Sequence, residues 1–141
     1  MKYITSNVAE TEQIAKSIGE RLKGGEVLCL YGDLGSGKTT FTQALGRHIG
    51  IKKRILSPTF IIVRHYDIDN KIIRNFYHLD LYRLSSIEES QDLDINQFLG
   101  KPGNITVIEW PEKIEKIIQK KRINIYFKYI NENTREITVD G

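Results

Sequence analysis

The chain has 141 residues, of which 40% are hydrophobic and 28% are charged. A chain of this length can bury about two-thirds of its unfolded surface, so we expect one compact domain over residues 1–141. The hydrophobic fraction excludes global disorder, and no apolar run approaches the about 20 residues of a membrane helix. The single cysteine excludes an internal disulfide, and the first residues carry no apolar secretory signal. We therefore expect a cytoplasmic monomer without membrane contact.

The net charge is +3, from 21 basic and 18 acidic side chains. This balance argues against the strongly basic surface that is typical of a dedicated nucleic-acid binder. Two short basic runs, 52–54 and 120–122, are interpreted as solvated charges of loops or helix ends. Direct contact with RNA stays open at this point.

The first third of the chain predicts a helix, a buried strand and a second helix. Apolar residues recur at helical spacing between 14 and 22, after a capping signal formed by Asn7 and Glu10. Residues 26–31 form an apolar run without polar alternation, which is typical of a strand buried on both faces in a parallel sheet. After a glycine-rich turn, apolar residues between 41 and 49 share one helical face.

The rest of the chain predicts antiparallel pairs around a second buried strand. The strand-like segments are 60–63, 72–81, 105–108, 123–129 and 137–139, and the helical ones open at 85–89 and around 114–118. Polar residues 67–71 predict an edge hairpin, and the turn at 131–134 predicts a terminal one. The predicted fold is therefore α/β, with a parallel central sheet and antiparallel edge strands, flanked by helices.

The segment 32–39 reads GDLGSGKT and fits the phosphate-binding loop pattern G-x-x-x-x-G-K-[ST]. Its glycines let backbone N–H groups approach phosphate oxygens, and the following helix adds its positive end. Lys38 would reach the β- and γ-phosphates, and the Thr39 hydroxyl would ligate Mg²⁺. The sequence thus predicts a P-loop NTPase-like nucleotide site. Residues 70–73 lack the aspartate of a guanine-reading motif, which favours ATP.

A P-loop protein also needs a carboxylate opposite the loop, usually at the carboxyl end of a neighbouring strand. Glu109 ends the apolar run 105–108 and is the favoured metal ligand. Asp80 lies between apolar and aromatic residues in the segment 78–82, where an unpaired carboxylate would be costly to bury. The sequence leaves the roles of the two carboxylates exchangeable.

Four segments of the chain stand out in order: 32–41, 57–60, 78–83 and 109–112. Together they resemble the TsaE (YjeE) family of small bacterial ATPases for threonylcarbamoyladenosine modification of tRNA. Their order and spacing match, and the resemblance extends from Thr11 in the first helix to Arg135 in the last hairpin. Ser36 stands where the family usually has alanine, a small change that should preserve the loop.

The resemblance implies an ATPase that works with the TsaD and TsaB proteins, which transfer threonylcarbamoyl to adenosine 37 of tRNA. Contact with tRNA would then be indirect, through the complex. Thr39 and Glu109 would hold Mg²⁺, Asp80 and Lys38 would serve hydrolysis, and 57–59 would form a switch-like loop. The residues expected at the nucleotide are Thr11, Asp33, Leu34, Gly35, Ser36, Gly37, Lys38, Thr39, Thr40 and Arg135.

Two other functions compete with this ATPase hypothesis. A P-loop small-molecule kinase usually carries an arginine-rich lid, whereas the arginines between 40 and 109 are spread out. A binding module could instead use ATP only as a structural ligand. Because no obvious arginine finger follows the loop, we expect hydrolysis by the isolated protein to be slow and stimulated by partner binding.

Overall fold

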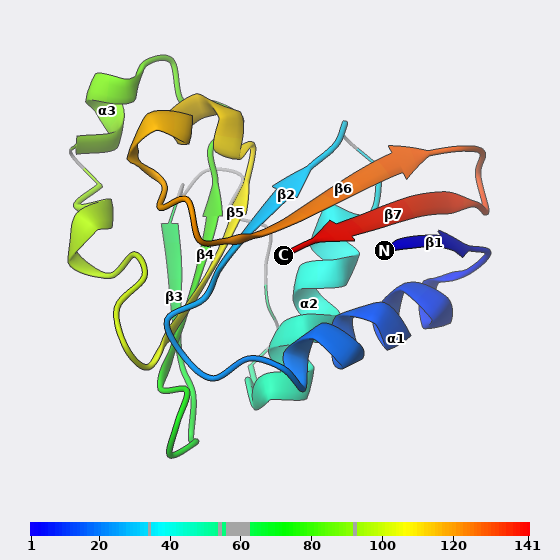
Figure 1. The fold of residues 1–141 in the computed structure, drawn as a ribbon, viewed down its shortest axis with the longest axis horizontal. Coiled ribbons are helices and arrows are strands. Elements are labelled where there is room, and N and C mark those ends of the chain that lie inside the picture. The colour runs from blue at the N-terminus through cyan, green and yellow to red at the C-terminus, as the bar shows by residue number, and fades with distance from the viewer. Residues whose placement is uncertain (34, 54, 56–62, 92) are drawn as a thin grey trace.

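One seven-stranded sheet organises the computed structural model, which describes residues 1–33, 35–53, 55, 63–91 and 93–141. The strands are β1 (Lys2–Thr5), β2 (Val27–Tyr31), β3 (Val63–Asp67), β4 (Asn75–Asp80), β5 (Asn104–Glu109), β6 (Ile123–Tyr129) and β7 (Arg135–Asp140). Their order is β1-β7-β6-β2-β5-β4-β3 (Figure 1). The four central strands, from β6 to β4, run parallel, while β3, β7 and β1 pair antiparallel with their neighbours. The predicted parallel centre with antiparallel edges is confirmed.

Two apolar cores lie on opposite faces of this sheet. The helices are α1 (Val8–Gly19), α2 (Lys38–Ile49) and α3 (Ile87–Gln91), with 3-10 turns η1 (Ile95–Gln97) and η2 (Pro111–Ile117). One core joins α1 and α2 to the sheet, and the other joins η1 and η2 to it. In β2, Leu28 and Leu30 belong to the first core, while Val27 and Cys29 belong to the second. This division explains the unbroken apolar run, because both faces of β2 are covered.

The start of α1 follows its predicted cap. Asn7 accepts a hydrogen bond from the backbone N–H of Glu10 at 2.9 Å, and Glu10 accepts one from the N–H of Ser6 at 2.7 Å. The bond to Asn7 satisfies an N–H group that the first turn leaves without a helical partner, and the bond from Ser6 fixes the residue before the cap. The helix ends at Gly19, however, before residue 22, the last apolar position of the predicted helical spacing.

Three elements differ from the sequence-based expectations. The strand β1 was not predicted, since it is only four residues long and buries only Thr5. The helix expected around 114–118 is the 3-10 segment η2, in which Ile114 has non-helical backbone angles (φ −132°, ψ 28°). The edge hairpin is confirmed as β3 and β4, but β4 begins at Asn75 rather than 72, and residues 60–62 of the expected strand lie outside the described residues.

Among the described residues, no helix has both the length and the apolar character needed to cross a membrane. The longest helices, α1 and α2, have 12 residues each.

Gly32 closes the connection between β2 and the glycine-rich loop. Its φ of 147° lies outside the range that residues with a side chain readily adopt. A Cβ atom at this position would lie 2.6 Å from the Phe127 carbonyl oxygen in β6 and 2.8 Å from Ser36 Oγ. The glycine therefore lets the loop turn directly against the backbone of a neighbouring strand.

We expect Gly32→Ala to lower the free energy of unfolding by about 1–3 kcal/mol, because it combines backbone strain with a backbone collision. Urea unfolding followed by circular dichroism measures this change. Gly35→Ala is the matched control, since Gly35 has a φ of 77° but no described atom within 4 Å of the added Cβ. Equal stability of the two variants would contradict the role assigned to the Phe127 carbonyl.

Candidate functional site

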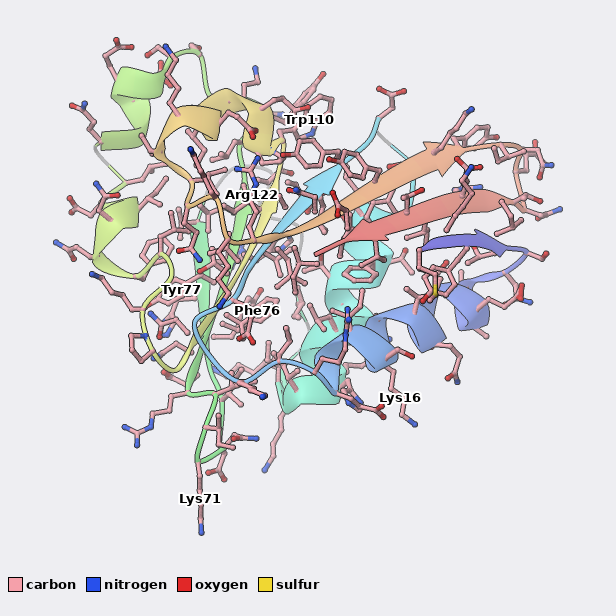
Figure 2. The ribbon with its side chains drawn as sticks, viewed as in Figure 1. Lys16, Lys71, Phe76, Tyr77, Trp110 and Arg122 are labelled. Atoms are coloured by element: carbon pink, nitrogen blue, oxygen red, sulfur yellow. The ribbon has the colours of Figure 1, made fainter. Side chains whose placement is uncertain are left out.

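The carboxyl ends of three parallel strands bring the proposed site residues together. In the strand register Glu109 of β5 lies opposite Leu30 of β2 on one side and Asp80 of β4 on the other. The loop 32–37 leaves the same end of β2 and leads into α2. Figure 2 shows Trp110 at this end of the sheet, while Lys71 marks the opposite end, at the tip of the β3–β4 hairpin. The glycine loop and the two carboxylates therefore lie at the same end of the sheet.

Lys38, the first residue of α2, turns its side chain back toward this end of the sheet. The residue is 4% exposed, and its Nζ atom donates a hydrogen bond to the Gly32 carbonyl oxygen at 2.5 Å. Nζ also lies 4.3 Å from the ring centre of Trp110, within the range of a cation–π contact. Burial lowers the pKa of Lys38, while the negative charges of Glu109 and Asp80 act in the opposite direction. The charge of this buried ammonium group is therefore favoured by the two carboxylates at the neighbouring strand ends.

The two carboxylates have different surroundings. Glu109 is 4% exposed, and its Oε2 atom accepts a hydrogen bond from His78 Nε2 at 2.6 Å. Asp80 is half-buried, and its Oδ1 atom accepts a hydrogen bond from the backbone N–H of Tyr82 at 3.1 Å. Burial raises the pKa of Asp80 and Glu109 raises it further, whereas the Tyr82 bond, His78 and Lys38 oppose the shift. Such a carboxyl group is a better proton acceptor than a solvated aspartate.

Trp110 links the metal-ligand candidate to the loop. It follows Glu109 directly and has a left-handed backbone conformation (φ 61°), which is uncommon for a residue with a large side chain. Its ring lies 5.1 Å from the ring of Tyr82 and also contacts the Lys38 ammonium group. The Trp110 ring therefore contacts the loop lysine directly.

Two glycines of the loop have backbone conformations that residues with a side chain rarely adopt. Gly35 and Gly37 both have positive φ values, of 77° and 105°. Gly37 is also the N-cap of α2 and provides no side-chain cap, so the first N–H groups of this helix remain available. Below the loop, Ser36 is buried, and its Oγ atom has no hydrogen-bond partner among the described residues. Exposed N–H groups at a helix start favour a bound anion.

A cavity of about 290 Å³ lies beside the loop. Four residues predicted to be near the nucleotide line it together: Thr11, Gly37, Thr40 and Arg135. Its remaining lining residues, none of them expected from the sequence, are Thr5, Ser6, Asn7, Val8, Glu132 and Asn133. Arg135 also donates a hydrogen bond to the Gly35 carbonyl oxygen at 3.3 Å, which connects β7 to the loop. The cavity and the loop are therefore neighbours.

Some of the expected site residues form no described contact with Lys38, Glu109 or Asp80. Thr39 is half-buried and, among the described residues, forms no side-chain hydrogen bond with Glu109 or Asp80. Asp33 is exposed and influences Lys38 through its charge alone. Leu34 and the segment 57–60 lie outside the described residues.

His78 is the residue that the sequence analysis missed at this site. Its spacing from the other histidines indicates no metal site, which favoured a core or surface role. The available signal was its position two residues before Asp80, because alternate residues of a strand share one face.

Known proteins are similar to this chain over almost its whole length. The model of the family "Threonylcarbamoyl adenosine biosynthesis protein TsaE" matches residues 5–137. The tRNA threonylcarbamoyladenosine biosynthesis protein TsaE of Bacillus subtilis is 38% identical over 138 residues, covering 98% of this chain and 84% of that protein. The protein of the same name from Aquifex aeolicus is 34% identical, covering 98% of this chain and 94% of its own length.

A solved structure agrees with these sequence matches. The crystal structure of YdiB from Bacillus subtilis is similar to this fold with a TM-score of 0.80 and 35% sequence identity. The match covers 99% of this chain and 83% of that one. Sequence and fold therefore lead to the same conclusion: the chain belongs to the threonylcarbamoyl adenosine biosynthesis protein TsaE family.

Proposed function

We propose that this protein is a Mg²⁺-dependent ATPase with a P-loop NTPase-like fold that serves threonylcarbamoyl modification of adenosine 37 in tRNA. One observation carries the proposal: the buried ammonium group of Lys38 bonds to the loop backbone at Gly32, and the charges of Glu109 and Asp80 act on its pKa from the neighbouring strand ends. Loop, lysine and acidic strand ends are the parts that a triphosphate and its metal ion require. Membership in the TsaE family supports the proposed role in threonylcarbamoyl modification of tRNA.

The chain's own groups explain how a triphosphate would be held. Lys38 Nζ now contacts the Gly32 carbonyl oxygen, and a phosphate oxygen would offer the ammonium group a stronger, charge-assisted partner. The uncapped N–H groups at the start of α2 would donate to the same phosphates. The cavity lined by Thr11, Thr40 and Arg135 is the proposed place of the nucleoside. Asp33, Leu34, Gly35, Ser36 and Gly37 complete the proposed binding loop.

The residues present fit a magnesium ion. Glu109 is buried and uses Oε2 for His78, whereas its Oε1 atom has no hydrogen-bond partner among the described residues. Those residues contain no group of three or more His, Cys, Asp or Glu side chains that could hold a metal. Mg²⁺ needs no such group, because it is usually bound by one or two protein ligands together with phosphates and water. Glu109 and Thr39 would be those ligands, and the ion would neutralise charge on the phosphates.

Asp80 is the proposed catalytic carboxylate. Its Oδ1 atom is oriented by the Tyr82 N–H, and its raised pKa makes it a suitable acceptor for a proton of the attacking water. Lys38 would stabilise the negative charge that develops on the transferred phosphoryl group. This division of roles assigns catalysis to Asp80 and metal binding to Glu109.

The partners are proposed from the family resemblance. We assign TsaD and TsaB as the proteins with which this ATPase acts, so that tRNA is reached through the complex. We also propose that this protein is a single P-loop domain, that it is monomeric when isolated and that it works in the cytoplasm.

Lys38→Ala is expected to weaken ATP binding about 30- to 150-fold, which corresponds to losing charge-assisted contacts of about 2–3 kcal/mol. Isothermal titration calorimetry with ATP and Mg²⁺ measures the affinity. Lys16→Ala, which removes an exposed lysine on α1, is the control and should bind like the unmodified protein. Unchanged affinity of Lys38→Ala would rule out the proposed loop site.

Asp80→Ala is expected to retain ATP affinity within about threefold but to lower kcat by about 10²–10⁴, because the proton acceptor is removed. Steady-state phosphate release and calorimetry separate the two effects. Asp69→Ala removes an exposed aspartate of the β3–β4 connection and should leave both quantities unchanged. If Asp80→Ala hydrolyses ATP at the original rate, another group must accept the proton. If neither the variant nor the unmodified protein hydrolyses ATP, the structural-ligand module replaces the ATPase.

Addition of TsaD and TsaB is expected to raise the slow ATP hydrolysis of the isolated protein at least about tenfold, since groups supplied by a partner can complete a P-loop site. Phosphate release with and without the two proteins measures the effect, and Lys38→Ala should show no stimulation. Rapid turnover that the partners leave unchanged would contradict the coupling role. Phosphorylation of a nucleoside or metabolite would favour the small-molecule kinase instead.

A further inference from the structure

We propose that His78 is a positioning residue that holds the Glu109 carboxylate in place for Mg²⁺. The inference deepens the proposed function and rests on it, because it concerns the same nucleotide-bound metal. It assigns a role to a buried histidine that the mechanism above does not use.

The strand geometry brings His78 to Glu109. Alternate residues of a strand share a face, so His78 and Asp80 lie on the face of β4 that also carries Phe76. On β5 the same rule places Glu109 with Ile105 and Val107. Phe76, Ile105 and Val107 belong to the core under α1 and α2. The polar residues therefore continue an apolar face at the point where it reaches the start of α2.

Because His78 and Glu109 are both buried, their side chains depend on each other for hydrogen bonding. Glu109 is 4% exposed and His78 is fully buried, so neither side chain can rely on water. The bond of 2.6 Å from His78 Nε2 to Glu109 Oε2 is the side-chain hydrogen bond that each of them forms among the described residues. A buried carboxylate that keeps one oxygen bonded and the other free has a defined orientation and retains an oxygen for a ligand.

The second nitrogen of His78 argues against a general structural role. His78 Nδ1 is buried and has no hydrogen-bond partner among the described residues. A histidine that only tied two strands together would be expected to use both ring nitrogens, because buried polar atoms are rarely left unpaired. Within the part of the chain that the structure describes, the ring is used on one side only, toward Glu109. Asp80 needs no such support, since the Tyr82 backbone N–H orients it.

Three substitutions separate positioning from folding. His78→Phe keeps a ring but removes the donor, and His78→Asn places an amide too far from Glu109 to replace the bond. His78→Gln has a longer side chain whose amide N–H can reach the same carboxylate oxygen. His65→Phe, an equivalent change at an exposed histidine on β3, is the matched control.

Calorimetric titration of ADP in excess EDTA and at graded Mg²⁺ concentrations is the main measurement. For His78→Phe and His78→Asn we expect ADP affinity in EDTA to change less than about threefold. The Mg²⁺ concentration that gives half of the metal-dependent gain in affinity should rise about 10- to 100-fold. His78→Gln should recover most of this loss, and His65→Phe should match the unmodified protein. Saturating Mg²⁺ should restore most of kcat in His78→Phe.

The unmodified protein supplies a measurement that does not depend on whether variants fold. When Mg²⁺ is added to the ¹⁵N-labelled ADP complex, the imidazole ¹⁵Nε2 signal of His78 should shift, while those of His48 and His65 should not. An unshifted His78 signal, or the same Mg²⁺ dependence in His78→Phe or His78→Asn and in the unmodified protein, would overturn the inference. If ADP binding by the unmodified protein does not depend on Mg²⁺ at all, the proposed magnesium site fails instead.

Discussion

The site depends on how one buried lysine is neutralised. Lys38 is removed from water, which disfavours its charged form, and the carboxylates of Glu109 and Asp80 counteract that effect. This balance is possible only because β2, β5 and β4 are parallel neighbours, so that their carboxyl ends meet at one edge. A change in strand order would leave the ammonium group or the buried Glu109 carboxylate without its counter-charge.

Groups around this charged centre each fix the position of one part of the site. Gly32 lets the loop approach the backbone of β6, and Trp110 lies over the Lys38 ammonium group. His78 holds one oxygen of Glu109, and the Tyr82 N–H holds one oxygen of Asp80. The contacts come from β4, β5, β6 and the loop after β2. Electrostatic catalysis requires groups that are oriented before the substrate arrives, and the proposed ATPase would use these contacts for that orientation.

The antiparallel edge of the sheet extends the candidate site beyond the glycine loop. Arg135 at the start of β7 donates to the Gly35 carbonyl oxygen and lies over the ring of Tyr129 in β6. With the residues before α1 it lines the cavity next to the loop. The terminal hairpin and the first helix, which are distant in sequence, therefore meet at the proposed nucleoside position. The match to the family model, over residues 5–137, includes these distant segments as well as the loop.

Local sequence determined the elements whose signals are short-range. The run 26–31 specified a strand covered on both faces, Asn7 with Glu10 specified the start of α1, and the glycines of 32–37 specified a loop with positive φ values. The tertiary structure alone decided the pairings: that β1 lies beside β7, that Glu109 lies opposite Asp80, and that His78 reaches Glu109. Caps, turns and periodicity act within a few residues, whereas strand register and the neutralisation of buried charge arise only between segments that folding brings together.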